Sequence, residues 1–167
     1  SVALVFFSNS DNYTVTVGKW GYKTTQTTDL YFNETTGTYV VYLEKGYYDD
    51  FYFDYNWVVD GTATTGFFER GIPNGVSFAG EAANPYLDDP LDYGNYCYVT
   101  GNGESTGDNV GGGVTRLTSP FFDLSTYNNP TISYERWVFF QGSSNDTMQV
   151  LLSDGSTSKV VETIVNG

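Results

Sequence analysis

Histidine is absent from this 167-residue chain, and cysteine occurs once. A serine or cysteine nucleophile is normally activated by a neighbouring histidine, so the sequence argues against hydrolases of that kind. The stretch GESTG at 103–107 matches the pattern of a nucleophile elbow, but no helical pattern follows it, and we interpret it as a loop. A zinc site is disfavoured by the same lack of ligands. A glycosidase-type carboxylate pair stays open, because nothing in the sequence singles out two acids.

Basic residues are also scarce. Seven lysines and arginines stand against 20 acidic residues, which gives a formal charge of −13. Such a chain repels phosphate backbones and anionic lipid headgroups, so we expect no nucleic-acid partner. Cys97 has no second cysteine to pair with, and its setting GNYCYVTG predicts a buried thiol on a strand.

Long apolar runs are missing. No stretch approaches the ~20 apolar residues of a membrane-spanning helix, so we expect no membrane insertion. VALVFF at 2–7 is too short and unflanked for a signal peptide. Export therefore requires a signal that has been removed or that lies outside this chain.

The composition favours an all-β fold. Aromatic residues make up 18% of the chain, glycine contributes 19 residues, and Thr, Val and Tyr dominate the alternating stretches, whereas helix-forming runs are missing. The alternation predicts strands at 3–8, 13–22, 27–32, 38–46, 51–59, 64–69, 95–100, 114–118, 131–140, 147–153 and 159–165.

The predicted loops become longer after residue 47. Residues 1–46 hold four predicted strands, which is about half of a seven-stranded sandwich. Residues 47–167 have long loops, such as 80–95 and 101–113, which suit the sheet-to-sheet crossings of a jelly roll. We therefore expect two all-β units, a partial Ig- or transthyretin-like sandwich followed by a jelly-roll sandwich.

Specific segments carry a family resemblance. YTVTVGKWGYKT at 13–24 and TYVVYLEKGYYDDF at 38–51 resemble carboxypeptidase regulatory-like, transthyretin-type β domains of secreted Bacteroidota proteins. Residues 53–75, 84–102 and 111–140 resemble the MAM-like or cleaved-adhesin-like jelly rolls of the same proteins. The resemblance covers nearly the whole chain and implies a non-catalytic extracellular module. The first unit lacks its opening strands and the second stops after KVVETIVNG, so both are expected to be incomplete.

The stretch YYDDFYFDYNW at 47–57 predicts the first strand of the second unit. Read with a period of two, its aromatic residues point to one face and its acids to the other. The apolar face holds Phe51, Phe53, Tyr55 and Trp57, and the opposite face holds Asp50, Tyr52, Asp54 and Asn56. The acids are either solvated or gathered around a cation.

Calcium is the cation that these acids favour, since Ca²⁺ takes six to eight oxygen ligands. The resemblance to MAM-like jelly rolls implies that Asp54, which follows Phe53, is a metal ligand. Asp50 lies about 13 Å away along a strand, so the two cannot share one ion without a bulge. Partners from other strands are Asp108, Asp146 or the acids of the loop at 88–92.

Two kinds of sugar site are predicted. The triplets at Asn12, Asn33 and Asn145 match N-glycosylation sequons, and DTM at 146–148 resembles the O-glycosylation motif of Bacteroidota, which would modify Thr147. Aromatic rings near the junction of the two units would stack on glycans. Those rings are Trp20, Tyr22, Tyr47 and Tyr48.

Incomplete β units predict self-association. Two open sandwiches would expose sheet edges and apolar surface, which strands from neighbouring copies can cover. VALVFF at 2–7 and SKVVETIVNG at 158–167 are suitable donor segments. We expect a secreted fibre or surface-layer subunit that joins head to tail. The alternative is a carbohydrate-binding or adhesin module of a larger secreted enzyme.

Overall fold

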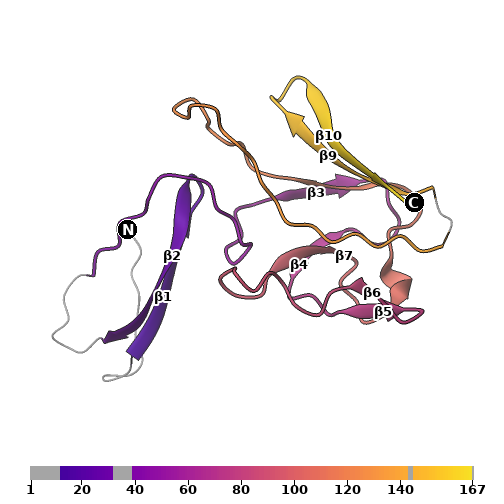
Figure 1. The fold of residues 1–167 in the computed structure, drawn as a ribbon, viewed down its shortest axis with the longest axis horizontal. Helices are drawn as coiled ribbons and strands as arrows, with labels where there is room; N and C mark the ends of the chain where they lie inside the picture. The colour runs from indigo at the N-terminus through magenta and orange to yellow at the C-terminus, as the bar shows by residue number, and fades with distance from the viewer. Residues whose placement is uncertain (1–11, 32–38, 143–144, 167) are drawn as a thin grey trace.

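A computed structural model describes residues 12–31, 39–142 and 145–166, which form strands and one short 3₁₀ helix (Figure 1). No helix in this part of the chain is long and apolar enough to cross a membrane. The all-β prediction is confirmed. The strands are β1 (Asn12–Lys19), β2 (Tyr22–Tyr31), β3 (Val58–Gly61), β4 (Phe68–Gly71), β5 (Val76–Phe78), β6 (Glu81–Asn84), β7 (Cys97–Thr100), β8 (Thr115–Thr118), β9 (Thr147–Ser153) and β10 (Ser158–Val165), and the helix η1 is Thr106–Asp108.

Every sheet among the described residues has two antiparallel strands. Three sheets are hairpins of consecutive strands, namely β1–β2, β5–β6 and β9–β10, and the other two, β3–β8 and β4–β7, join distant parts of the chain. The β1–β2 hairpin stands apart at one end of the molecule, and the β9–β10 hairpin projects from the other part (Figure 1). The division into a transthyretin-like unit and a jelly roll stays a prediction, because two-stranded sheets do not distinguish the two folds.

The first hairpin differs from its prediction. The expected strand at 13–22 breaks at Trp20 and Gly21, where the glycine takes a φ of 86°, and β2 then runs back along β1 from Tyr22. Positive φ costs glycine little, which is why the turn forms there. The expected strand at 27–32 is the end of β2. The expected strand at 38–46 is wrong for the described residues 39–46, where only Lys45 forms a β-bridge, to Tyr22. The predicted strand at 3–8 lies outside the described residues.

In the second half, the predictions for β7, β8, β9 and β10 are confirmed within a few residues. The strand expected at 64–69 begins later, as β4. Residues 131–140 form no strand, although their sequence alternates as a strand would. The short hairpin of β5 and β6 was not predicted, and β6 lies within the stretch 80–95 that was interpreted as a loop.

The buried core is small. The buried apolar side chains in the described part are Ala63, Val76 and Val99. Aromatic rings do most of the remaining packing, as where Phe51 meets Trp57 and Tyr98 at centroid distances of 5.3 and 5.1 Å. The accessible surface is 11,998 Å², whereas a compact chain of this mass is expected to expose about 8,200 Å². The fold therefore leaves much apolar surface uncovered.

Candidate functional site

Residues 47–57 form a folded loop, so the strand prediction for 51–57 is wrong. Three aspartate side chains each accept a hydrogen bond from the backbone N–H two residues later, an arrangement that bends the chain. These pairs are Asp49 with Phe51 at 2.9 Å, Asp50 with Tyr52 at 3.1 Å and Asp54 with Asn56 at 2.8 Å. Phe51 and Asn56 have positive φ values of 55° and 64°, which no strand would allow. The alternation of aromatic and acidic faces is lost.

Asp50 is the most deeply buried side chain of this loop, with 1% of its surface exposed. Its Oδ1 accepts from the Tyr52 N–H, and its Oδ2 accepts from the Tyr93 N–H at 3.2 Å. Burial raises the pKa of Asp50, and these hydrogen bonds oppose that rise. The carboxylate thus ties the loop at 47–57 to the loop before β7.

Arg70 on β4 holds the same loop from another direction. Its Nε donates to the carbonyl of Phe51 and its Nη2 to the carbonyl of Tyr52, each at 2.8 Å. The guanidinium also lies over the Tyr96 ring, 4.5 Å from its centroid. Sequence reasoning missed this residue, because its partners are backbone atoms nearly 20 positions away.

Acidic side chains gather beside Asp50. The Tyr48 hydroxyl donates to Asp92 Oδ1 at 2.6 Å, and burial together with this carboxylate raises the pKa of Tyr48. Asp88 Oδ2 is buried and accepts no hydrogen bond from the described residues. Burial, and then the nearby Asp92, Asp89 and Asp50, raise the pKa of Asp88. The loop at 88–92 and the neighbouring Asp50 therefore bring several acidic side chains together in poorly hydrated surroundings.

The predicted calcium ligands do not form one site. Asp50 is used by backbone amides, Asp54 closes its own turn, Asp108 lies in η1 and Asp146 precedes β9. Within residues 12–31, 39–142 and 145–166, no three Asp, Glu or Cys side chains lie together as a metal ion would require. Calcium binding stays a prediction that these four positions do not support together.

The predicted glycosylation positions are accessible where the structure describes them. Asn12, Asn145 and Thr147 are exposed, and Asn33 lies outside the described residues. Asn12 and Thr147 are the first residues of β1 and β9. Modification of these residues stays a prediction.

Trp20 and Tyr47 attach the first hairpin to the rest of the molecule. Their ring centroids are 5.2 Å apart, and both rings meet Phe122 at 4.9 Å. The indole Nε1 of Trp20 donates to the carbonyl of Phe121 at 2.8 Å, and the Tyr47 hydroxyl accepts from the Asp123 N–H at 2.6 Å. Both predicted stacking rings are therefore engaged in packing within the chain.

The other two predicted stacking rings lie elsewhere. Lys19 lies over the Tyr22 ring at 5.3 Å, and Tyr48 is bonded to Asp92. The four rings do not form one continuous platform for a glycan.

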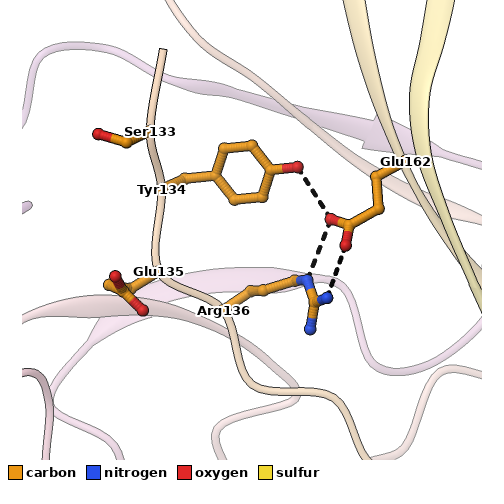
Figure 2. Close-up of a pocket in the computed structure, with 5 residues that line it drawn as sticks. All are labelled: Ser133, Tyr134, Glu135, Arg136 and Glu162. Carbon is orange, nitrogen blue, oxygen red and sulfur yellow. Dashed lines mark hydrogen bonds and ion pairs between the residues drawn. The ribbon is translucent and has the colours of Figure 1, made fainter. Parts of the chain in front are cut away.

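An open hollow of about 430 Å³ lies where the segment at 133–136 meets β10 (Figure 2). Glu162 fills its polar side by accepting from Arg136 Nη2 at 2.6 Å, from Arg136 Nε at 3.1 Å and from the Tyr134 hydroxyl at 2.8 Å. These donors lower the pKa of Glu162, so the carboxylate stays ionised. The cluster fastens the β9–β10 hairpin to the body of the chain, and the carboxylate of Glu162 is fully used in that attachment.

Ser105 and Cys97, the two side chains considered as nucleophiles, both take part in the local structure. Ser105 of the GESTG stretch caps η1, and its Oγ accepts from the Gly107 N–H at 3.3 Å. Cys97 is half-buried on β7, and burial raises the pKa of its thiol to about 11. A thiol of that pKa stays protonated at neutral pH.

Comparison with models of known protein families found no match, and comparisons with curated proteins and with solved structures found none either. The resemblance to Bacteroidota β modules therefore stays a prediction from the sequence.

Proposed function

We propose that this chain is a non-catalytic, extracellular structural or adhesive subunit whose open sheets are completed by strands of neighbouring copies. The observation that supports this most is the strand count, because no sheet in the described part of the chain has more than two strands. A two-stranded sheet is marginal in water and gains stability from further strands or covering elements. Each hairpin thus presents open edges to a partner.

The size of the surface supports the same proposal. The chain exposes 11,998 Å², about 3,800 Å² more than the compact form expected for its mass. A standard protein interface buries about 800 Å² on each partner, so the excess is enough for more than one interface per copy. Two interfaces per copy are what a linear assembly needs.

Segments that could form strands but lie outside the described sheets add a third line of support. Residues 40–43 (VVYL) and 131–137 (TISYERW) have strand composition, yet neither belongs to a ladder of the described residues, and Tyr42 is 90% exposed. VALVFF at 2–7, outside the described residues, is the donor segment in this proposal. The segment at 158–167 is a weaker donor than the sequence suggested, because β10 already pairs with β9 of its own chain.

Size and shape in solution test the proposal. We expect light scattering after size-exclusion chromatography to show species larger than 18.5 kDa, and electron microscopy to show regular filaments. Filaments with a constant repeat would separate ordered assembly from amorphous aggregation. A variant lacking residues 2–7 is expected to remain short or monomeric. A compact monomer with cooperative unfolding at all concentrations would contradict the proposal.

Glycan binding is the second candidate. Tyr42, Tyr86 and Trp137 are strongly exposed, and exposed rings are the stacking surfaces that sugars use. Binding on a glycan array that disappears in Trp137→Ala, but persists in Trp20→Ala, would favour this function over assembly alone.

A further inference from the structure

β9 is an edge strand with one free side. It pairs with β10 along Thr147–Ser153, and no other strand of the described residues lies beside it. The N–H and C=O groups on its outer side therefore have no ladder partner in that part of the chain. Such an edge is a template for pairing with another strand.

The sequence of β9, TMQVLLS, has none of the usual features that block edge pairing. Proteins protect edges with charged side chains, proline or bulges. Residues 147–153 contain no charge, no proline and no glycine. The irregularity of this hairpin lies on β10, between Val160 and Glu162, while the partners on β9 remain consecutive. The outer edge of β9 is thus regular and open.

The hairpin has one half-buried face and one exposed face. Met148 and Val150 are half-buried, whereas Leu151 is 49% exposed and its cross-strand partner Val160 is 44% exposed. An edge strand with apolar side chains on both faces is suited to the interior of a wider sheet.

We propose that β9 pairs with β9 of a second copy, which joins the two hairpins into a four-stranded antiparallel sheet around a two-fold axis. This inference rests on the proposed function, since it names where two copies meet. An axis at Val150 places Met148 opposite Leu152, Gln149 opposite Leu151 and Thr147 opposite Ser153 of the partner. Apolar side chains then meet on the half-buried face, and the two hydroxyls meet at the ends of the ladder.

Charge explains why a second copy approaches at this strand. Each copy carries a formal charge of −13, so like-charge repulsion opposes contact over most of the surface. β9 is an uncharged stretch between Asp146 and Asp154. In the symmetric register, these two aspartates lie opposite each other at the ends of the ladder, so added salt is expected to strengthen the dimer.

Single-cysteine cross-linking tests the register. In a Cys97→Ser background, cysteine is placed at 148, 150 or 152 and the protein is oxidised. Only residue 150 faces its own copy across the axis, with Cβ atoms about 5 Å apart, so the disulfide-linked dimer is expected to peak at Val150→Cys. Circular dichroism of the reduced variants checks that each one folds.

A matched pair of charge variants tests edge pairing against stacking of hairpin faces. Leu151→Lys and Val160→Lys alter partners on the same exposed face, but only Leu151 lies on the proposed interface strand. Analytical ultracentrifugation is expected to show a rise of roughly tenfold in the dimer dissociation constant for Leu151→Lys and little change for Val160→Lys.

The outcomes separate this inference from the proposed function. Assemblies that form with equal cross-linking at all three positions, or that weaken equally in the two lysine variants, would overturn pairing through β9 and leave assembly itself intact. A chain that is monomeric at every concentration would overturn both.

Discussion

The loop at 47–57 and the β9–β10 hairpin both use aspartate to turn the chain, yet their surroundings are opposite. Asp50 is buried between two loops, and its pKa is raised by loss of water. Asp154 is exposed in the hairpin turn, and hydrogen bonds from the Thr157 and Ser156 amides and hydroxyls lower its pKa. Asp50 therefore stabilises its turn at a cost in lost hydration, whereas Asp154 stabilises its turn while it remains exposed to water.

Removal of the buried aspartate is expected to have the largest effect on stability. Asp50→Ala leaves the Tyr52 and Tyr93 amides without their acceptor, and each buried unpaired group costs about 1–3 kcal/mol, so we expect a loss of about 3 kcal/mol in the free energy of unfolding. Urea unfolding measures this loss. Asp154→Ala is the matched control, with a smaller expected loss because water reaches its turn. Equal losses would remove the contrast between the two regions.

Arg70 is expected to have the second-largest effect. Arg70→Lys keeps the charge but loses the paired donors to the Phe51 and Tyr52 carbonyls, which we expect to destabilise the fold by about 2 kcal/mol. Arg136→Lys is the control at the attachment of the hairpin, where the bond to Glu162 is exposed and weaker in its effect. Unfolding followed by tryptophan fluorescence gives both values, and a larger effect at residue 136 would contradict this ranking.

The two regions are expected to respond to acid in opposite directions. Asp49, Asp50 and Asp88 have raised pKa values, so they bind protons more tightly in the folded state, and the free energy of unfolding rises as the pH falls from their folded pKa values toward 3.8. Glu162 and Asp154 have lowered pKa values, so their contribution is complete above their ordinary pKa and is lost at lower pH.

Amide hydrogen exchange measured at several pH values distinguishes these responses. Protection of residues 51–57 should rise as the pH falls through the folded pKa values of these buried aspartates toward 3.8, while protection of β9 and β10 should fall once the pH drops below the ordinary pKa values of Glu162 and Asp154. A parallel loss in both regions would show that net charge alone governs the response.

The smallest expected effect belongs to Asp54. Among the described residues its carboxylate accepts only from the exposed Asn56 amide, so Asp54→Ala should cost about 0.5 kcal/mol, well below the cost of Asp50→Ala. A cost close to that of Asp50→Ala would show that the turn itself, and not the burial of the acid, stabilises the loop.

The sequence predicted those elements whose signals are local. β9 and β10 alternate in apolar character around an Asp-Gly turn, and both were placed within a residue or two. Residues 51–57 also alternate, but Asp49, Asp50 and Asp54 each accept from the backbone amide two residues later, and Arg70 binds two carbonyls from a distant strand. Neither a side-chain acceptor that competes with the ladder nor a distant donor is visible in a period-two pattern.

The segment at 131–140 shows the other limit of local patterns. Alternation indicates that a stretch is able to form a strand, but a strand also needs a neighbour to pair with, and the described part of the chain supplies none here. Prediction of the candidate site from the sequence was limited in the same way. Asp54 was predicted as a calcium ligand from a family resemblance and the other three acids from their type and position, whereas the surroundings of all four depend on contacts such as that between Asp50 and Tyr93.

Val161 is the extra residue of the β10 irregularity, since Val160 faces Leu151 and Glu162 faces Val150. Because of this one extra residue, the side chains that follow it on β10 point to the opposite face from the one that unbroken alternation would give them. Deletion of Val161 would make Val160 and Glu162 neighbours, and regular alternation would still place Glu162 opposite Val150 and Thr163 opposite Gln149. In-frame loss of that codon would therefore straighten β10 and keep Glu162 on the face where it meets the Arg136 guanidinium.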